Sequence, residues 1–513
     1  MKRTIKKVAV LGSGIMGSRI ACHFANIGLD VLLLDIIPNE PTDQEKSSGL
    51  SIDSPQVRNR IVNMALDVAI KSKPSPLYAS SKAANIQTGN FEDDLQKLKN
   101  CDWIIEAVVE NLEIKKSLFE KVEKFRTPGT LITSNTSGIP IHLMTHGRSA
   151  DFQKHFCGTH FFNPPRYLRL LEIIPTTQTD PAIVAFFLHY GNLYLGKETV
   201  LCKDTPAFIA NRIGVYSMMS GMHAVQKTDF SVGEIDKLTG PVIGRAKSAT
   251  FRTSDLVGLD TTVKVSENLF HALQSDESKE RFAVPAIVKE LHGRNWLGDK
   301  TRQGFYKKTV DANGQKDILE LDLKTFEYVP KRKSKLDILE KTKNVEDLKA
   351  RLRIAISLEG KEGDFYRETF FDLFRYCTYR IPEIADELYR IDQAVSAGFA
   401  WEMGPFETWD AMGLKEIHEK MIAAGYQSAE WISELLAAGH TSFYTYIKGS
   451  RHYYDIPTKS YKSIPGTEGF ILLDAFRENK IVWKNDGSTL YDVGDGILNL
   501  EFHTKMNSLG PEV

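Results

Sequence analysis

Short runs of apolar residues alternate with amphipathic, helix-like segments over about the first two hundred residues of the chain. The apolar runs cover residues 8–11, 31–34, 103–109, 130–133 and 158–162. Runs of this length, separated by helical patterns, are typical of the buried strands of a parallel sheet with helices on both faces. The sequence therefore predicts a doubly wound α/β sheet. A polar stretch rich in Pro, Ser and Asp, residues 39–56, predicts a loop before a helix at 58–71.

The pattern changes from strands to helices at Asp204. An aspartate followed two residues later by a proline, Pro206, is typical of an N-cap and a first helical turn, and it predicts a helix that runs through Met219. Helical patterns continue to about residue 455. A polar, lysine-rich stretch at residues 307–343 interrupts them and predicts a linker or a hairpin. The sequence thus predicts a sheet followed by a mostly α-helical part.

Two segments of the helical part resemble each other. Asp236 lies 22 residues before the glycine of the Asp255-Leu-Val-Gly-Leu motif, and Asp392 lies 21 residues before the glycine of the Asp410-Ala-Met-Gly-Leu motif. Repeated elements of this kind can pack against one another as pseudo-dimers. We interpret the segments as two related helical modules, and a chance similarity is the alternative.

The composition of the chain argues against several classes of function. Lysine and arginine total 65 against 66 acidic residues, so the chain offers no broad positive surface to nucleic acid or to an anionic membrane. No apolar stretch approaches the ~20 residues that cross a bilayer. The five cysteines are widely spaced without a CxxC pair, and the 13 histidines show no HExxH spacing. We therefore expect a cytoplasmic protein without a metal site.

A glycine-rich turn follows the first predicted strand. Gly12, Gly14 and Gly17 form GxGxxG, a spacing that makes a tight turn, lets the backbone approach a pyrophosphate, and lets the next helix pack on the sheet. Asp35, at the end of the second strand, is placed to accept hydrogen bonds from the adenosine ribose and would repel a 2′-phosphate. The sequence therefore predicts a Rossmann domain that binds NAD rather than NADP. A glycine turn that binds no nucleotide is the alternative.

Polar residues gather where further strands end. Glu110 and Lys115 follow the strand at 103–109, and Ser137 follows the strand at 130–133. Because the carboxyl ends of parallel strands form the ligand-binding edge of such a sheet, Glu110 and Lys115 are candidates to face the cofactor. Ser137 is a candidate to bind a substrate oxygen. A solvated helix start, an exposed lysine and a turn cap are the alternatives.

His160 and Glu172 lie twelve residues apart in two consecutive apolar strands. Burying the glutamate without a partner would cost several kcal/mol. We therefore expect the two side chains to pair as a base and the carboxylate that orients it, and a structural histidine is the alternative.

Seven motifs occur in an order and spacing that resemble the 3-hydroxyacyl-CoA dehydrogenases. They are residues 12–17, 106–111, 134–137, 160–164, 172, 203–206 and 211–212. The resemblance covers about residues 5–215. It implies NAD-dependent oxidation of 3-hydroxyacyl-CoA to 3-ketoacyl-CoA in fatty-acid β-oxidation, with His160 as the general base and Glu172 as its partner. It also implies that Ser137 and Asn211 contact the substrate oxygen and the cofactor.

The resemblance is less complete in the helical part. Residues 249–251 read Ala-Thr-Phe where the family usually carries Gly-Pro-Phe, whereas residues 404–406 of the second copy keep Gly-Pro-Phe. This departure leaves the preferred acyl-chain length open. Residues 298–306 match the family's usual terminal motif and place the end of the first module near residue 308.

The last fifty residues differ from the rest. Leu498, Leu500 and Phe502 alternate with polar residues, the pattern of a half-buried strand. Residues 486–509 resemble the opening strand of an enoyl-CoA hydratase of the crotonase family. We expect this strand to be unpaired, which would make the chain the front of a longer fused polypeptide. The hydratase catalytic residues are absent from the sequence, so we expect no hydratase activity.

These observations divide the chain into five parts. They are a NAD-binding Rossmann domain at 1–203, a first helical domain at 204–308, a linker at 309–345, a second helical repeat at 346–455 and a hydratase-like extension at 456–513. An acyl-CoA thioester is the expected substrate, and the assembly is expected to be a monomer built on the internal repeat or a homodimer. A NAD-binding scaffold without turnover and a thioesterase with a Ser137, His160 and Glu172 triad are the alternatives.

Overall fold

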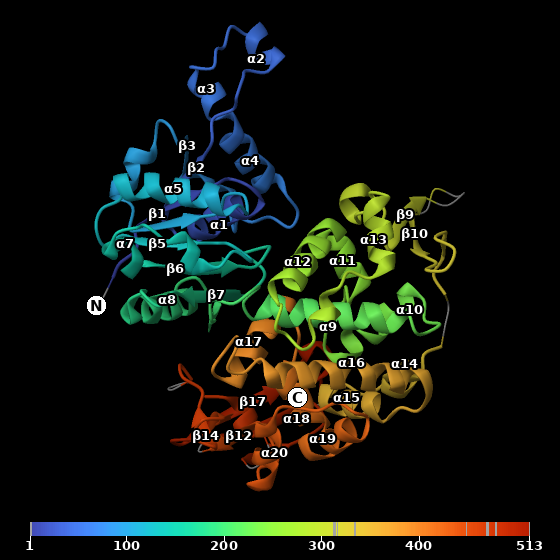
Figure 1. Ribbon diagram of the computed structural model, residues 1–513. Coiled ribbons are helices and arrows are strands. Elements are labelled where there is room, and N and C mark those ends of the chain that lie inside the picture. Colours follow the sequence, from blue (N-terminus) through green and yellow to red (C-terminus); the bar gives the residue numbers. More distant parts are fainter. Residues whose placement is uncertain are drawn as a thin grey trace.

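The computed structural model describes residues 3–513 except 311–313, 315, 333–334, 448, 468–470, 478–479 and 512. Parts of the predicted linker and of the predicted hydratase-like extension therefore lie outside the described residues. Figure 1 shows an α/β body, formed by the N-terminal part of the chain, beside a larger helical body.

An eight-stranded sheet forms the N-terminal body. In spatial order its strands are β3 (Ile86–Asn90), β2 (Asp30–Asp35), β1 (Lys7–Leu11), β4 (Trp103–Glu106), β5 (Leu131–Ser134), β6 (Phe156–Phe161), β7 (Leu170–Pro175) and β8 (Glu198–Leu201). Strands β1 to β6 run parallel, whereas β7 is antiparallel to β6 and β8 is parallel to β7. The predicted doubly wound sheet followed by a mostly helical part is confirmed.

Helices pack on both faces of this sheet. They are α1 (Ile15–Asn26), α4 (Arg60–Lys71), α5 (Leu112–Phe125), α6 (Ile141–Met144), α7 (Ala150–Lys154) and α8 (Pro181–Leu193). Val8 and Val10 share a hydrophobic cluster with α1, while Ala9 and Leu11 share the other cluster with α5. Burial on both faces explains why β1 is apolar throughout rather than alternating.

The stretch predicted as a loop contains two short helices, α2 (Asp43–Ser47) and α3 (Pro55–Arg58). They lie at the tip of a segment that projects from the α/β body (Figure 1). Thr42 and Glu45 form a reciprocal capping box that starts α2.

Helix α9 (Ala210–Val225) begins later than Asp204 predicts. Ala207 and Phe208 adopt positive φ angles of 59° and 51°, which interrupt a helix at that point. The Asp204 carboxylate instead accepts hydrogen bonds from the N–H groups of Ile141 (2.8 Å) and His142 (2.9 Å) at the start of α6. The N-cap prediction is therefore wrong, because this aspartate caps a helix that lies earlier in the chain.

The helical body consists of two sets of helices on either side of α9. The first set is α10 (Val232–Leu238), α11 (Phe251–Val257), α12 (Leu259–Ala272) and α13 (Ala286–Gly293). The second set is α14 (Asp337–Thr342), α15 (Leu348–Ser357), α16 (Gly360–Tyr379), α17 (Leu388–Phe399), α18 (Pro405–Met412), α19 (Leu414–Ala423) and α20 (Glu430–Ala437). Helices α16 and α17 pack directly against α9, and one continuous hydrophobic cluster includes residues of both sets.

The two sets repeat the same polar contacts. The Tyr306 hydroxyl donates to Asp236 (2.7 Å), and the Tyr444 hydroxyl donates to Asp392 (2.6 Å). Asp236 and Asp392 also accept from backbone N–H groups at the start of α11 and α18. These matching contacts support the interpretation of the helical part as a repeat.

A second aspartate in each set makes a matching contact as well. Asp255 accepts hydrogen bonds from the N–H groups of residues 305–306, and Asp410 accepts them from residues 443–444. Burial raises the pKa of Asp255 to about 6 and that of Asp410 to about 7, although the N–H donors act in the opposite direction. The aspartates named in the two sequence motifs thus hold equivalent turns.

Short antiparallel sheets follow each set of helices. Strands β9 (Tyr306–Val310), β10 (Lys316–Leu321) and β11 (Tyr328–Pro330) form the first sheet, in which β9 and β10 pair as neighbours. The sequence predicts either a linker or a hairpin for the lysine-rich stretch, and a hairpin is present. Strands β12 (Tyr444–Ile447), β13 (Ser450–Asp455) and β14 (Ser460–Ser463) form the second sheet.

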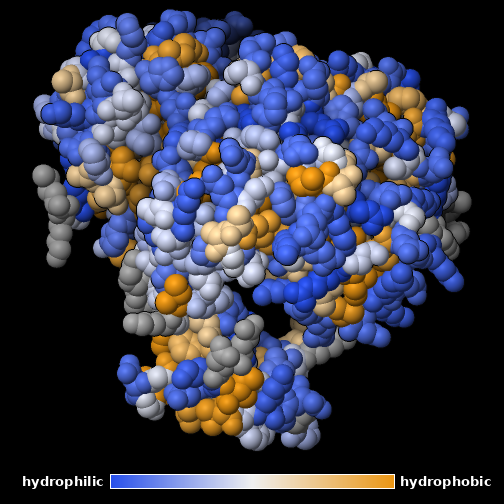
Figure 2. Space-filling view, turned by 60° about the horizontal axis from the view of Figure 1, so that its bottom comes forward, coloured by the Kyte–Doolittle hydropathy of each residue, from blue (hydrophilic) through white to orange (hydrophobic). Residues whose placement is uncertain are grey.

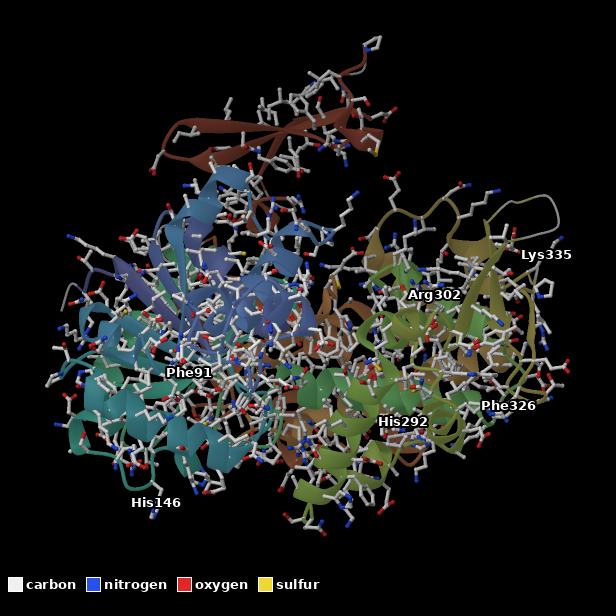
Figure 3. The ribbon with its side chains drawn as sticks, turned by 90° about the horizontal axis from the view of Figure 1, so that it is seen from above. Phe91, His146, His292, Arg302, Phe326 and Lys335 are labelled. Carbon is white, nitrogen blue, oxygen red and sulfur yellow. The ribbon has the colours of Figure 1, made fainter. Side chains whose placement is uncertain are left out.

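The C-terminal segment forms a third antiparallel sheet of β15 (Ile481–Lys484), β16 (Ser488–Gly494) and β17 (Ile497–Phe502). The strand predicted to be unpaired is β17, and that prediction is wrong, because β17 pairs with β16 along its length. Figure 3 shows the sheet standing away from the rest of the molecule. Figure 2 shows apolar side chains on the surface of the projecting lobe. The exposed large apolar side chains of the sheet include Ile481, Val482, Trp483, Leu498 and Leu500.

Within the described residues, no helix has the length and apolar character that a membrane span requires.

Candidate active site

The turn between β1 and α1 has the geometry of a pyrophosphate cradle. Gly12 has a φ of +101°, and a Cβ at Gly17 would lie 1.8 Å from the Gly12 carbonyl oxygen. A Cβ at Gly14 would meet no heavy atom within 4 Å. The first and third glycines are thus required by the turn and by helix packing, while the second leaves open space before the N–H groups of α1. This arrangement fits a dinucleotide phosphate.

Asp35, the last residue of β2, reaches back to the same turn. Its carboxylate accepts hydrogen bonds from the backbone N–H (2.6 Å) and the hydroxyl (2.5 Å) of Ser13. The carboxylate therefore lies beside the glycine turn, where a ribose joined to the pyrophosphate would reach it. These residues fit the adenosine half of NAD.

A buried ion pair lies at the end of β4. Lys115 of α5 donates to Glu106 (2.7 Å), and its ammonium nitrogen lies 3.4 Å from a Glu110 oxygen. The Glu106 side chain is fully buried and the Lys115 side chain is 1% exposed. Burial raises the pKa of Glu106, although Lys115 and the Ser134 hydroxyl oppose that shift. Lys115 is thus enclosed, and sequence reasoning missed Glu106 as its partner.

Glu110 orients the loop that carries Ser137. One of its oxygens accepts hydrogen bonds from the Thr136 hydroxyl (2.6 Å) and from the N–H groups of Ser137 and Gly138 (both 3.0 Å). Burial alone would raise the pKa of Glu110, but Lys115 and these donors outweigh it and lower the pKa below the ordinary value. The carboxylate therefore stays charged and fixes the loop after β5.

We expect Lys115→Met to lower the free energy of unfolding by about 3–5 kcal/mol, because it leaves the Glu106 carboxylate buried without its cation. The loss should grow as the pH rises from about 4 towards neutrality, since removing the ammonium raises the folded-state pKa of Glu106 further above its ordinary value. Urea unfolding at several pH values measures both effects. The matched control is Lys116→Met, which removes a surface pair with Glu113. Equal stability of the two variants would contradict the expected role of Lys115.

His160 and Glu172 face each other across two paired strands. They are register partners in the antiparallel pair β6 and β7, and His160 Nδ1 lies 2.7 Å from Glu172 Oε2. His160 is 4% exposed and Glu172 is fully buried. The expected pairing of these two side chains is confirmed.

The N-terminus of α9 holds the other oxygen of Glu172. Oε1 accepts hydrogen bonds from the N–H groups of Ile209 (3.1 Å) and Ala210 (2.8 Å). The thiol of Cys202 also lies beside this carboxylate, and burial together with the charge of Glu172 raises its pKa. Sequence reasoning missed these donors, because backbone groups leave no residue-type signal.

Ser137 completes a line of polar side chains. Its hydroxyl lies 3.2 Å from His160 Nε2, the ring nitrogen opposite the one that faces Glu172. The imidazole packs beside the ring of Phe162, with 4.7 Å between ring centres. Asn211 follows directly after the N–H donors of α9 and makes no side-chain hydrogen bond within the described residues. Its amide is therefore free for a ligand.

Two models of one family match the chain. Residues 7–205 match the 3-hydroxyacyl-CoA dehydrogenase, NAD binding domain, and residues 208–308 match the 3-hydroxyacyl-CoA dehydrogenase, C-terminal domain. The matched NAD binding domain contains the glycine turn and Asp35.

Curated relatives extend the similarity. A probable 3-hydroxyacyl-CoA dehydrogenase of Bacillus subtilis is 46% identical over 100% of this chain, which spans 64% of that relative. A probable 3-hydroxyacyl-CoA dehydrogenase of Deinococcus radiodurans is 46% identical over 61% of this chain and 85% of the relative. A putative fatty acid oxidation complex trifunctional enzyme of Rickettsia prowazekii is 31% identical over 100% of this chain and 65% of the relative. The chain thus spans less than two thirds of the longer relatives.

Solved structures share the fold. A 3-hydroxybutyryl-CoA dehydrogenase from Escherichia coli has a TM-score of 0.59 at 20% identity, and the match covers 85% of this chain and 100% of that chain. This likeness shows a shared fold. The two matched domain models and the relatives lead to one conclusion: the chain belongs to the 3-hydroxyacyl-CoA dehydrogenase family.

Proposed function

We propose that the chain oxidises 3-hydroxyacyl-CoA thioesters to 3-ketoacyl-CoA with NAD, as in fatty-acid β-oxidation. The observation that carries the proposal is the hydrogen-bonded line of Ser137, His160 and Glu172 at the sheet edge that also carries the glycine turn. A base held by a buried carboxylate, beside a dinucleotide site, suits the removal of a proton from a secondary alcohol.

The protein supplies the proton transfer. Glu172 accepts a hydrogen bond at His160 Nδ1, which leaves Nε2 as the acceptor for the 3-hydroxyl proton. When that proton arrives, the Glu172 carboxylate stabilises the imidazolium. The hydroxyl of Ser137 and the amide of Asn211 hold the reacting oxygen near Nε2. Bound NAD⁺ supplies the hydride acceptor.

The cofactor is proposed to lie over the glycine turn. Gly12, Gly14 and Gly17 shape the pyrophosphate site, and Asp35 binds the adenosine ribose. Glu110 faces the nicotinamide end. Lys115 acts on the cofactor through Glu110, because its own ammonium is enclosed between carboxylates.

We expect Asp35→Asn to raise the KM for NAD about tenfold and to reduce the preference for NAD over NADP. The variant loses hydrogen bonds to a charged acceptor, worth about 1.5–3 kcal/mol each, and removes the repulsion of a 2′-phosphate. Initial rates with both cofactors provide the measurement. Asp30→Asn, at the exposed start of the same strand, is the control. An unchanged KM for both cofactors would exclude Asp35 from the site.

The direct test of the function is NADH formation from 3-hydroxyacyl-CoA substrates of increasing chain length. Turnover that requires both NAD and the thioester supports the proposal, and the same series gives the preferred chain length. NAD binding without turnover of any member would favour the alternative of a non-catalytic scaffold.

The contact between Ser137 and His160 also suits a thioesterase, since serine, histidine and glutamate form a continuous line. Ser137, however, lies outside a GxSxG elbow. Release of free CoA from acyl-CoA in the absence of NAD would identify a hydrolase, whereas a dehydrogenase leaves the thioester intact.

We propose the five-part division of the chain given above, with the second helical repeat taking the place of a partner subunit. The packing of α16 and α17 on α9 supports this division. Sedimentation analysis tests it: a monomer is expected, and a homodimer is the alternative.

We further propose that residues 456–513 open a crotonase-type domain in a longer polypeptide. The exposed apolar face of the C-terminal sheet supports this view, as does the greater length of the relatives. Because the cysteines are free and buried, we place the protein in a reducing cytoplasm.

A further inference from the structure

A small cavity lies between α9, the segment that joins α10 to α11, and the C-terminal end of α17. Its volume is about 40 Å³. A single water needs about 10–15 Å³ by the same measure, so the cavity has room for roughly three waters or one carboxylate group. Its lining includes Ala249 and Thr250, the positions at which the sequence departs from the family's Gly-Pro-Phe motif.

Arg245 places a positive charge in the wall of this cavity. Its guanidinium lies 4.0 Å from the centre of the Trp401 ring and makes no hydrogen bond or ion pair within the described residues. Burial lowers its pKa to about 10, so the group stays charged at neutral pH. By contrast, Arg212 and Arg380, also between the two sets of helices, both pair with Asp276 at 2.6 Å. A partly buried cation without a counter-charge is costly, and a bound anion would offset that cost.

The cavity and the candidate substrate contact Asn211 both lie along α9. Asn211 and Gly214 lie three residues apart, so they face the same side of the helix. A Cβ at Gly214 would lie 2.2 Å from the Phe399 ring, so this ring fits because residue 214 is glycine. Phe399 also contacts Phe162, which packs beside His160. Gly214 in the cavity wall thus lies roughly one helical turn, about 5 Å, along α9 from Asn211.

We propose that this cavity receives the far end of a short acyl chain, and that Arg245 selects 3-hydroxyacyl-CoA substrates whose chain ends in a carboxylate. The proposal rests on the dehydrogenase function proposed above. A guanidinium binds a carboxylate through paired, charge-assisted hydrogen bonds, whereas a methyl end leaves it unpaired. The second set of helices takes part through Phe399 and Trp401, so both sets determine specificity.

The test compares two six-carbon 3-hydroxyacyl-CoA substrates that differ only at C6, which is a methyl group in one and a carboxylate in the other. We expect the wild-type protein to favour the carboxylate-ended substrate in kcat/KM. Arg245→Met should lower that value about 10- to 100-fold, since hydrogen bonds to charged groups contribute about 1.5–3 kcal/mol. The methyl-ended substrate should change less than about twofold. Arg294→Met is the matched control, because Arg294 also lies over a tryptophan ring, that of Trp296.

Two results would overturn the proposal. One is a wild-type preference for the methyl-ended substrate. The other is an equal loss of kcat/KM for both substrates in Arg245→Met. That result would mean that Arg245 binds an anionic group of CoA or has only a structural role. If neither substrate is turned over, the proposed function fails instead, and calorimetric binding of glutarate then tests the cavity. Binding that Arg245→Met abolishes supports the anion site, and absence of binding to the wild-type protein rejects it. If Arg245→Met does not fold, Arg245→Gln and the glutarate measurement replace it.

Discussion

His160→Gln is expected to lower kcat about 10²- to 10⁴-fold while the affinity for NAD stays nearly unchanged. The variant removes the group that takes the hydroxyl proton but leaves the glycine turn and Asp35 in place. His160 has one nitrogen at Glu172 and the other at Ser137, and the ring is nearly buried. Glutamine is close to histidine in size, so the loss should reflect chemistry rather than packing. NADH formation under saturating NAD and substrate gives kcat, and NAD titration gives the affinity.

The matched control is His189→Gln, which changes an exposed histidine on α8. It should leave both quantities unchanged. A His160 variant with wild-type turnover would refute the assignment of the base. A variant that loses turnover and NAD affinity together, with a lowered melting temperature, would show that His160 supports the fold instead.

Local patterns predict the parts of this site that sit on single elements. The apolar runs and the GxGxxG spacing predict β1, the turn and α1, because each depends on neighbouring residues alone. The pairing of His160 with Glu172 could also be predicted, since two consecutive strands joined by a short connection tend to lie side by side. The register that places the two residues opposite each other confirms it.

Contacts between residues that lie far apart in the chain could not be predicted from the sequence. Asp204 looks like the cap of the helix that follows it, yet it caps α6, 63 residues earlier than itself. The proline that suggested a helix start is followed by two residues with positive φ, which sequence patterns do not reveal. Glu106 ends a buried strand, but its pairing with Lys115 depends on how α5 packs back onto the sheet.

The C-terminal extension shows that strand pairing is harder to predict from sequence than the strand itself. The alternating pattern predicts strand β17 but the wrong buried face, because Leu498, Leu500 and Phe502 are exposed while Asn499 and Glu501 are partly buried. The sequence of its partner β16 has no regular alternation. Because pairing depends on the partner as much as on the strand, a correct strand was combined with a wrong expectation about its neighbour.

Glu172→Gln should lower kcat about 10²-fold or more, even though the new side chain keeps the size and one oxygen of the old. The carboxylate accepts from His160 at Oε2 and from two backbone N–H groups, of Ile209 and Ala210, at Oε1. An amide has one acceptor oxygen, so it must turn its NH₂ group towards either the backbone donors or His160. If the oxygen stays with the backbone, the NH₂ group donates to Nδ1 and forces the ring proton onto Nε2, which removes the base. If the amide turns the other way, its NH₂ group meets the two backbone donors and α9 loses its anchor.

The two orientations of the new amide differ in their effect on stability. In the first, the melting temperature and NAD affinity stay close to wild type while kcat falls; in the second, stability falls as well. Glu198→Gln on the neighbouring strand β8 is the control, since its side chain lies 4.0 Å from Arg169 and makes no hydrogen bond or ion pair with His160 within the described residues. Wild-type kcat in Glu172→Gln would mean that neither the charge nor the acceptor at Nδ1 matters. The proposed proton transfer would then lose its physical basis, because an unheld imidazole has no preferred nitrogen with which to face the substrate.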